Sequence, residues 1–263
     1  MIDISCWASA GSPDSPPWRL SVAMEDLQIW RAAQRVELLH IRQAINAGER
    51  QRNTNAIHAH LRAALPRVRG LTVSYYMPFR GEPDLRQLLD DWRAAGAATA
   101  LPVVLGPGQA LEFRLWWPGA PLVKGALALP MPDGTPLVVP DVVLMPPVGF
   151  DERGFRLGHG GGFFDRTLAA LTPAPLKVGV AFEVTRMTSI RPQSYDIVMD
   201  YVITEAGLYR VQAEGLVRLS AGTAIAPQHP RLAAKLNIDD GQPHDLRPYA
   251  SSPCYAGEIG NND

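Results

Sequence analysis

The spacing of apolar side chains predicts helices in the first third of the chain. From Met24 to Ile45 apolar residues recur on one helical face, and this helix is expected to stop at Asn46–Gly48. A second helix is expected at residues 50–64. A third is expected to run from Asp84, as its N-cap, to Ala95. Amphipathic helices need another layer against which to bury their apolar faces.

Short apolar runs between and after these helices predict strands. Continuous apolar runs are typical of a parallel sheet covered on both faces, whereas alternating runs indicate an edge pair or a hairpin. A short helix is expected at residues 167–171. Strands that alternate with helices predict an α/β fold: a three-layer α/β/α single domain with a mostly parallel sheet. The expected continuous strands are 71–76, 98–104, 138–145, 176–182 and 197–204, and the alternating segments are 111–117 and 209–219.

The two ends of the chain and one internal segment lack such periodicity. Residues 1–23 mix Ser, Pro, Gly and Trp and are interpreted as an N-terminal extension to an α/β domain at 24–220. Residues 221–263 are rich in Pro, Asp and Asn and are expected to form an irregular C-terminal tail. The Pro- and Gly-rich segment 118–136 predicts a long loop, and long loops in compact domains tend to be functional or mobile.

Composition and charge exclude several classes of function. The 263 residues carry a net charge of −1, so neither nucleic acid nor a membrane surface is expected as a partner. No apolar run reaches transmembrane length, and the N-terminus lacks the basic and apolar regions of a signal peptide. The two cysteines, Cys6 and Cys254, argue against a disulfide framework and fit a reducing compartment. We expect a monomeric, cytoplasmic protein.

The segment Arg156–Arg166 carries the clearest chemical signal. It holds four glycines in five positions, Gly158 and Gly160–Gly162, after a predicted strand and before a predicted helix. Backbone N–H groups in such a turn can converge on an anion, and the N-terminus of the following helix favours phosphate. It is neither a Walker A loop, because no Gly-Lys-Ser/Thr follows, nor the usual dinucleotide fingerprint, because Phe163 fills the third glycine position. From the residues alone, a tight surface turn is the alternative.

Charged residues elsewhere suit an anionic ligand. Arg31, Arg35 and Arg42 fall on one edge of the first helix, where like charges repel unless an anion or carboxylates lie nearby. The alternative is a solvated basic edge. Glu82 follows the strand at 71–76, at the sheet edge where open α/β sheets bind ligands, and the alternative is an exposed loop carboxylate. Both groups are therefore candidates for a ligand site.

Two adjoining segments, Asp141–Asp151 and Gly154–Arg166, resemble the signature of the 5-formyltetrahydrofolate cyclo-ligase family, also called methenyltetrahydrofolate synthetases. That signature has a strand end with a proline and a Phe-Asp pair. It continues as Gly-x-Arg-Leu-Gly-x-Gly-x-Gly-(Tyr/Phe)-Tyr-Asp. Several motifs in the correct order are much more specific than one glycine loop. The resemblance spans residues 28–206 and includes Tyr76, Pro78, Glu82, Leu101–Val104, Tyr195–Asp196, Asp200 and Val202–Glu205.

The resemblance implies an ATP-dependent, Mg²⁺-requiring ring closure. In this family 5-formyltetrahydrofolate becomes 5,10-methenyltetrahydrofolate, with release of ADP and phosphate. The formyl oxygen is phosphorylated first, and N10 of the folate then attacks the activated carbon. Moving a phosphoryl group requires neutralisation of charge on the γ-phosphate, which an N–H cradle, arginines and Mg²⁺ supply.

Carried over position by position, the resemblance also implies site residues. Arg156 and Asp165 are expected to be catalytic, and Asp165 and Asp196 to hold Mg²⁺. Mg²⁺ prefers one or two carboxylates together with phosphate oxygens and water. The expected folate contacts are Glu82, Tyr76 and Phe163. The expected ATP contacts are Arg31, Arg35, Arg156, Leu157, Gly158, His159, Gly160, Gly161, Gly162, Phe163 and Phe164.

Three positions depart from the family pattern. Arg31 stands where the family has a lysine, Phe164 where it usually has a tyrosine, and Leu129 where it often has a glutamate. Two alternatives therefore stay open beside a folate cyclo-ligase. One is an ATP-dependent enzyme that acts on another N-formyl or pterin-like compound, and the other is a non-catalytic nucleotide- or folate-binding homologue.

Overall fold

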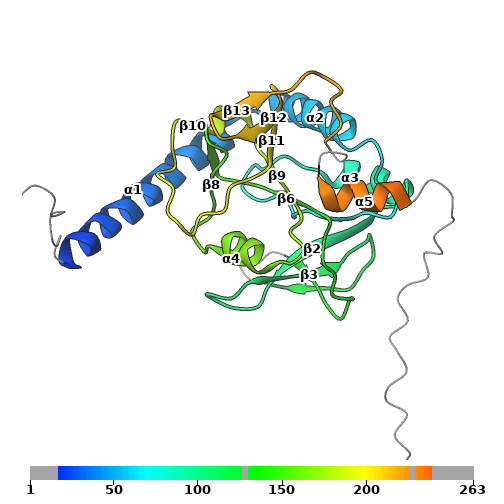
Figure 1. Cartoon of the computed structure of the whole chain (residues 1–263), viewed down its shortest axis with the longest axis horizontal. Coiled ribbons are helices and arrows are strands. Elements are labelled where there is room, and N and C mark those ends of the chain that lie inside the picture. Colours follow the sequence, from blue (N-terminus) through cyan, green and yellow to red (C-terminus); the bar gives the residue numbers. More distant parts are fainter. Residues whose placement is uncertain (1–16, 126–129, 226–228, 239–263) are drawn as a thin grey trace, which may run out of the picture.

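An eight-stranded sheet with the strand order β13-β12-β11-β9-β6-β1-β2-β3 forms the centre of the molecule (Figure 1). The computed structural model describes residues 17–125, 130–225 and 229–238. The neighbouring strands from β11 to β2 run parallel, and antiparallel strands flank them on both sides, as the sequence predicts. The strands are β1 (Thr72–Ser74), β2 (Ala98–Val104), β3 (Leu111–Leu115), β6 (Val142–Met145), β9 (Leu176–Val180), β11 (Tyr201–Thr204), β12 (Gly207–Gln212) and β13 (Gly215–Arg218).

Helices cover both faces of this sheet and give the predicted three layers (Figure 1). On one face a large apolar core joins the sheet to α2 (Ala47–Ala64), α3 (Arg86–Ala94) and α5 (Pro230–Ile238). On the other face a second core joins it to α4 (Phe163–Ala170) and to the strand β7 (Gly149–Asp151). Alternate residues of each strand point into the two cores, which is why the buried strands read as continuous apolar runs.

The long first helix, α1, spans Pro17–Ala44 and extends beyond the body of the molecule (Figure 1). It therefore begins inside the segment predicted as an extension, and residues 1–16 lie outside the described part. Leu38 of α1 packs with the buried residues Val148, Leu157 and Ile190. Helix α1 ends at Ala44, just before the predicted stop at Asn46–Gly48, and Asn46 caps α2 through its Oδ1, which accepts a hydrogen bond from Glu49 N at 2.9 Å.

Two small sheets lie outside the central one. Strands β10 (Arg186–Met187), β7 and β8 (Arg156–Leu157) form a three-stranded sheet that leads directly into the glycine loop. Strands β4 (Leu122–Lys124) and β5 (Pro130–Pro132) pair within the segment predicted as a long loop, so that segment contains a hairpin. Leu129, one of the three departures from the family pattern, lies outside the described residues.

Several predicted element boundaries were wrong. Helix α2 begins at Ala47 rather than at residue 50, and β6 and β11 begin at Val142 and Tyr201 rather than at residues 138 and 197. Helix α4 begins at Phe163 rather than at residue 167, directly after Gly162, which adopts the left-handed conformation (φ 63°). Helix α3 begins at Arg86 after Leu85 as its N-cap. Asp84 does not cap it: its Oδ1 accepts a hydrogen bond from Arg86 N at 3.0 Å and the carboxylate pairs with the Arg86 guanidinium. An aspartate bound to the backbone two residues on forms a turn rather than a cap.

The prediction of an irregular tail was wrong for residues 230–238, which form α5. Leu232 of this helix is fully buried in the core. Arg231 Nε and Lys235 Nζ lie 3.0 and 2.7 Å from the carboxylate oxygens of the fully buried Asp141, just before β6. The local composition predicts no helix here, whereas α5 is held by three long-range contacts, those of Leu232, Arg231 and Lys235. Residues 239–263 lie outside the described part.

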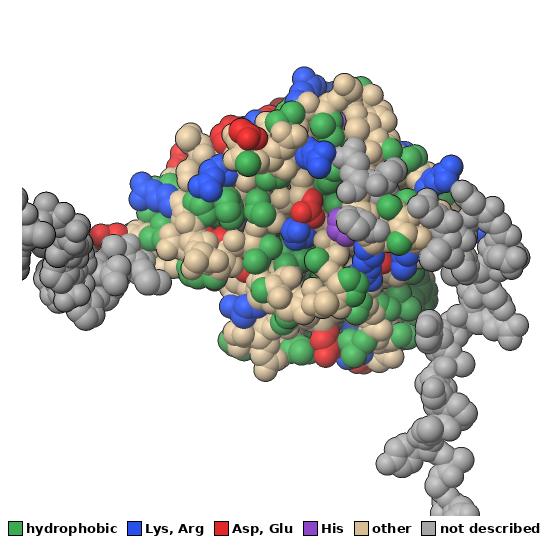
Figure 2. Space-filling view, viewed as in Figure 1, with side chains coloured by type: hydrophobic (Ala, Val, Ile, Leu, Met, Phe, Trp, Pro, Cys, Tyr) green, Lys and Arg blue, Asp and Glu red, His purple; other side chains and the backbone are tan. Residues whose placement is uncertain are grey.

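Helices in the described ranges are all too short or too polar to cross a membrane. On the face shown in Figure 2, basic and acidic side chains are interspersed with apolar ones and form no continuous basic surface. This agrees with the small net charge of the chain.

Candidate active site

The glycine loop connects β8 to α4, and two of its glycines have conformations that other residues rarely adopt. Gly160 and Gly162 have φ angles of 101° and 63°. A Cβ atom on Gly161 would lie 2.4 Å from the Phe163 ring, so a side chain at this position would displace that ring. The loop ends at the N-terminus of an eight-residue helix, whose first N–H groups have no partner within the helix. This arrangement can receive an anion.

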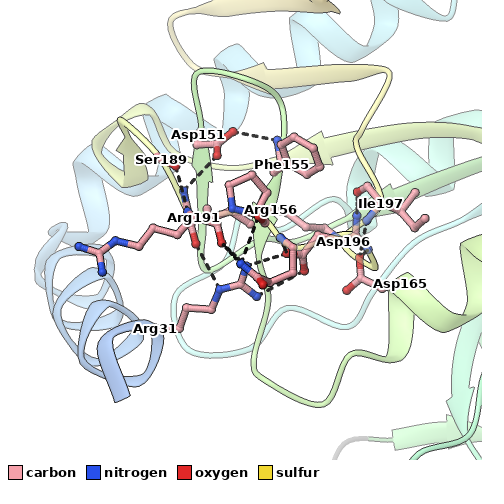
Figure 3. Close-up of polar contacts among 12 residues, drawn as sticks. Arg31, Asp151, Phe155, Arg156, Asp165, Ser189, Arg191, Asp196 and Ile197 are labelled. Atoms are coloured by element: carbon pink, nitrogen blue, oxygen red, sulfur yellow. Dashed lines mark hydrogen bonds and ion pairs between the residues drawn. The ribbon is translucent and has the colours of Figure 1, made fainter. Parts of the chain in front are cut away.

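Arg156 and Asp165 form a partly buried ion pair beside this loop (Figure 3). Arg156 Nη2 donates to Asp165 Oδ1 at 2.6 Å, and Nη1 donates to the carbonyl of Ile197 at 2.6 Å. The N–H of Ile197 in turn donates to Asp165 Oδ1 at 2.9 Å. Burial lowers the pKa of Arg156, while Asp165 and Asp196 act in the opposite direction. The two predicted catalytic residues therefore lie together.

Arg31 and Asp196 form a second buried ion pair (Figure 3). Arg31 Nη2 lies 2.6 Å from Asp196 Oδ2 and also donates to the Arg191 carbonyl at 2.8 Å. Arg31 Nε donates to the carbonyl of Ile190 at 3.2 Å. Arg31 thus joins α1 to the segment before β11, and its guanidinium is occupied by protein groups.

The hydrogen bonds in these two ion pairs determine which carboxylate oxygens of Asp165 and Asp196 can bind Mg²⁺. Asp165 Oδ2 has no hydrogen bond within the described ranges, and the side chain is 22% exposed, so this oxygen suits Mg²⁺. Both oxygens of Asp196 face Arg31, so Asp196 would have to give up part of that pair to bind metal directly. The described residues contain no group of three or more His, Cys, Asp or Glu side chains that could hold a metal ion. Mg²⁺ held by one or two carboxylates plus phosphate oxygens is compatible with this set.

The three arginines predicted to line one edge of α1, Arg31, Arg35 and Arg42, bind three different parts of the protein. While Arg31 pairs with Asp196, Arg35 Nε donates to the Gly158 carbonyl of the loop at 2.7 Å. Burial, and next the charge of Arg31, lower the pKa of Arg35. Arg42 is buried and donates to two backbone carbonyls, at 3.0 and 3.1 Å. Because none of the three is fully exposed, the alternative of a solvated basic edge was wrong.

Glu82 lies at the same site, and its side chain is only 3% exposed. Its Oε2 accepts a hydrogen bond from Phe79 N at 2.9 Å. Its Oε1 lies 3.5 Å from Arg42 Nη2 and 3.4 Å from Nε2 of His159, a residue of the glycine loop. The alternative of an exposed loop carboxylate was therefore wrong. The predicted folate contact and the predicted phosphate loop adjoin through His159.

A cavity of about 460 Å³ borders Glu82 on the side of α2. Its polar wall includes His58, whose Nε2 lies 2.8 Å from the Asp84 carbonyl. Burial lowers the pKa of His58. No motif in the sequence marks this wall, because α2 has the pattern of an ordinary amphipathic helix. The lining residues are Ala47, Arg50, Gln51, Thr54, His58, Glu82, Asp84 and Gln87.

Several predicted contact residues are packing residues in this structure. Tyr76 is buried and its hydroxyl donates to the Pro83 carbonyl at 2.9 Å; burial holds its pKa well above the ordinary value. Leu157 lies in the core beneath α1, and Phe164 packs on the sheet with the second core. Phe163 is more open, with the Arg166 guanidinium 5.6 Å from its ring centroid. Direct contacts of these residues with ligands stay predictions.

Comparisons with known proteins point to one family. The model of the 5-formyltetrahydrofolate cyclo-ligase family matches residues 28–205. A protein named 5-formyltetrahydrofolate cyclo-ligase from Mycolicibacterium smegmatis is 30% identical over 179 residues, which cover 65% of this chain and 91% of the relative. A protein of the same name from Escherichia coli K12 is 35% identical over 152 residues, 55% of this chain and 83% of the relative.

The fold is also found among solved structures. The NMR structure of Aquifex aeolicus 5,10-methenyltetrahydrofolate synthetase has a TM-score of 0.61 and 27% identity, and the match covers 72% of this chain and 96% of that one. Residues 28–205, which the family model matches, contain the glycine loop, both ion pairs and Glu82. The chain belongs to the 5-formyltetrahydrofolate cyclo-ligase family, and thereby to the ligases.

Proposed function

We propose that this protein converts 5-formyltetrahydrofolate to 5,10-methenyltetrahydrofolate with consumption of ATP in the presence of Mg²⁺. One observation carries the proposal beyond family membership. Nε2 of His159, in the glycine loop, lies 3.4 Å from Oε1 of Glu82, the position that matches the folate contact of the family. A phosphate bound at the loop and a folate bound at Glu82 would therefore lie close enough for group transfer.

The proposed reaction has two steps. The formyl oxygen attacks the γ-phosphorus of ATP, the bond to the β–γ bridging oxygen breaks, and ADP leaves. N10 of the folate then attacks the activated formyl carbon and loses its proton to solvent. The carbon–oxygen bond breaks, and phosphate departs with the former formyl oxygen. The first step is difficult because a formamide oxygen is a weak nucleophile and the γ-phosphate carries negative charge.

The chain supplies several groups for this step. N–H groups of the loop and of the first turn of α4 would bind the phosphates, and Arg35 holds the loop by its bond to the Gly158 carbonyl. Mg²⁺, when bound, neutralises phosphate charge, and Asp165 Oδ2 is the oxygen best placed to hold it. Arg156 orients Asp165 through its 2.6 Å hydrogen bond. Phe164 supplies no hydroxyl, so no step is assigned to that position.

The test is formation of the methenyl product by the purified protein with Mg-ATP and 5-formyltetrahydrofolate, followed by its near-ultraviolet absorbance. We expect product only when ATP and Mg²⁺ are both present. Binding of ATP without product would favour the non-catalytic homologue. ATP turnover with another N-formyl compound, but not with this folate, would favour the other alternative. The monomeric state and the cytoplasmic location stay predictions.

A further inference from the structure

The two oxygens of Glu82 are held very differently. Oε2 accepts a hydrogen bond of 2.9 Å from Phe79 N, whereas the polar contacts of Oε1 with the described residues are two long ones, 3.4 Å to His159 Nε2 and 3.5 Å to Arg42 Nη2. A carboxylate oxygen can accept more than one hydrogen bond, and burial makes an unfilled acceptor costly. Oε1 is therefore the atom of Glu82 that is best prepared to accept a new donor.

The two side chains next to Oε1, Arg42 and His159, differ in how firmly they are held. The side chain of Arg42 is 2% exposed, and it also donates to the carbonyls of Pro147 and Arg80 at 3.0 and 3.1 Å. The side chain of His159 is 31% exposed and stands between Gly158 and Gly160. The imidazole is thus the neighbour that can leave Oε1 without breaking a buried network.

His159 also contacts the turn that orients Glu82. Its ring lies 6.2 Å from the Phe79 ring, centroid to centroid, and Phe79 N is the donor to Oε2. On the other side, the Gly158 carbonyl, one residue before His159, accepts the hydrogen bond from Arg35. His159 therefore connects the loop that would hold phosphate with both the carboxylate and its supporting turn.

We propose that His159 couples the binding of nucleotide at the glycine loop to the binding of folate at Glu82, an inference that rests on the proposed function. With the loop empty, the imidazole covers Oε1 of Glu82. With nucleotide bound, the imidazole N–H turns to a phosphate oxygen, because a short charge-assisted hydrogen bond is stronger than a contact of 3.4 Å. Oε1 is then free to accept an N–H group of the folate. Nucleotide and folate strengthen each other's binding by the same factor, as linkage requires.

The experiment is titration calorimetry of 5-formyltetrahydrofolate, with and without a saturating non-hydrolysable ATP analogue and Mg²⁺. For the native protein we expect the folate Kd to fall at least about fivefold when the analogue is present. In His159→Ala the folate Kd without nucleotide should already equal the native value with nucleotide. The coupling factor, which is the folate Kd without the analogue divided by the Kd with it, should therefore approach one. His159→Gln, which keeps an N–H donor, should retain part of the factor. His40→Ala, an exposed histidine of α1, is the matched control and should behave as native.

Two results would overturn the proposal. One is a native-size coupling factor in His159→Ala. The other is an equal weakening of folate binding with and without nucleotide, which is what a purely structural histidine would cause. Failure of the proposed function gives a different pattern, because the native protein would then bind no folate or form no product.

Discussion

Replacement of Asp165 separates its predicted metal role from its structural role. Oδ1 accepts hydrogen bonds from Arg156 at 2.6 Å and from the N–H of Ile197 at 2.9 Å, while Oδ2 makes none within the described ranges. In Asp165→Asn one oxygen can still accept both bonds, but the negative charge is lost. In Asp165→Ala both donors lose their acceptor, and Arg156, which is 7% exposed, loses its closest counter-charge.

The cost to stability follows from this geometry. Removal of one partner of a buried ion pair typically costs about 3–5 kcal/mol. Asp165 is 22% exposed, and Arg156 keeps its bond to the Ile197 carbonyl, so we expect the lower end, about 3 kcal/mol for Asp165→Ala. For Asp165→Asn we expect about 1–2 kcal/mol. In a protein of this size each kcal/mol lowers Tm by about 2–4 °C, and both variants should stay folded at 25 °C.

The assay pairs urea denaturation with turnover measured as a function of Mg²⁺ concentration. Asp165→Asn should lower turnover by about 100-fold or more although most molecules are folded, because it removes charge from the metal ligand. Asp90→Asn, at a carboxylate on α3 that is 57% exposed, is the matched control and should change neither quantity appreciably. Near-native turnover and Mg²⁺ dependence in Asp165→Asn would refute the reasoning and leave Asp165 only its role as partner of Arg156.

Three further predictions concern stability. Arg31→Met should lower the unfolding free energy in urea by about 3 kcal/mol, because it leaves the 8%-exposed Asp196 carboxylate unpaired; a loss below about 1 kcal/mol would show that the pair is dispensable. Asp141→Asn should weaken the attachment of α5, seen as faster amide hydrogen exchange in residues 230–238, and unchanged protection would contradict the assigned contacts. Burial lowers the pKa of His58 and of His229, so the folded state binds fewer protons than the unfolded state. The free energy of unfolding should therefore be highest above about pH 6.5 and decline on acidification. In urea titrations His58→Gln should make this decline smaller, and an unfolding free energy that rises on acidification would refute the prediction.

The central sheet could be predicted because its signal is local and repeated. Each buried parallel strand reads as a continuous apolar run, and α/β alternation restricts the topology. Helix α5 could not be predicted in this way. The contacts that hold it, from Arg231 and Lys235 to Asp141, join residues about ninety positions apart, and only the folded chain brings them together.

The candidate site was predictable as a set of residues but not as a set of contacts. The glycine loop, Asp165 and Glu82 stand out in the sequence because glycines and carboxylates occur in a recognisable order. That Arg31 pairs with Asp196, whereas Arg42 faces Glu82, depends on which turn of α1 meets which loop. The role of Ile197 is invisible in sequence, because its backbone rather than its side chain binds Arg156 and Asp165.

The most direct test of the account is the ratio of methenyl product to ADP formed by the native protein from 5-formyltetrahydrofolate and Mg-ATP. The proposed mechanism uses one phosphoryl transfer for each ring closure. It therefore predicts a ratio of one to one, with no ADP released in the absence of folate. Product formed without ADP, or ADP released without product, would contradict the claim that the glycine loop and Glu82 form one catalytic site.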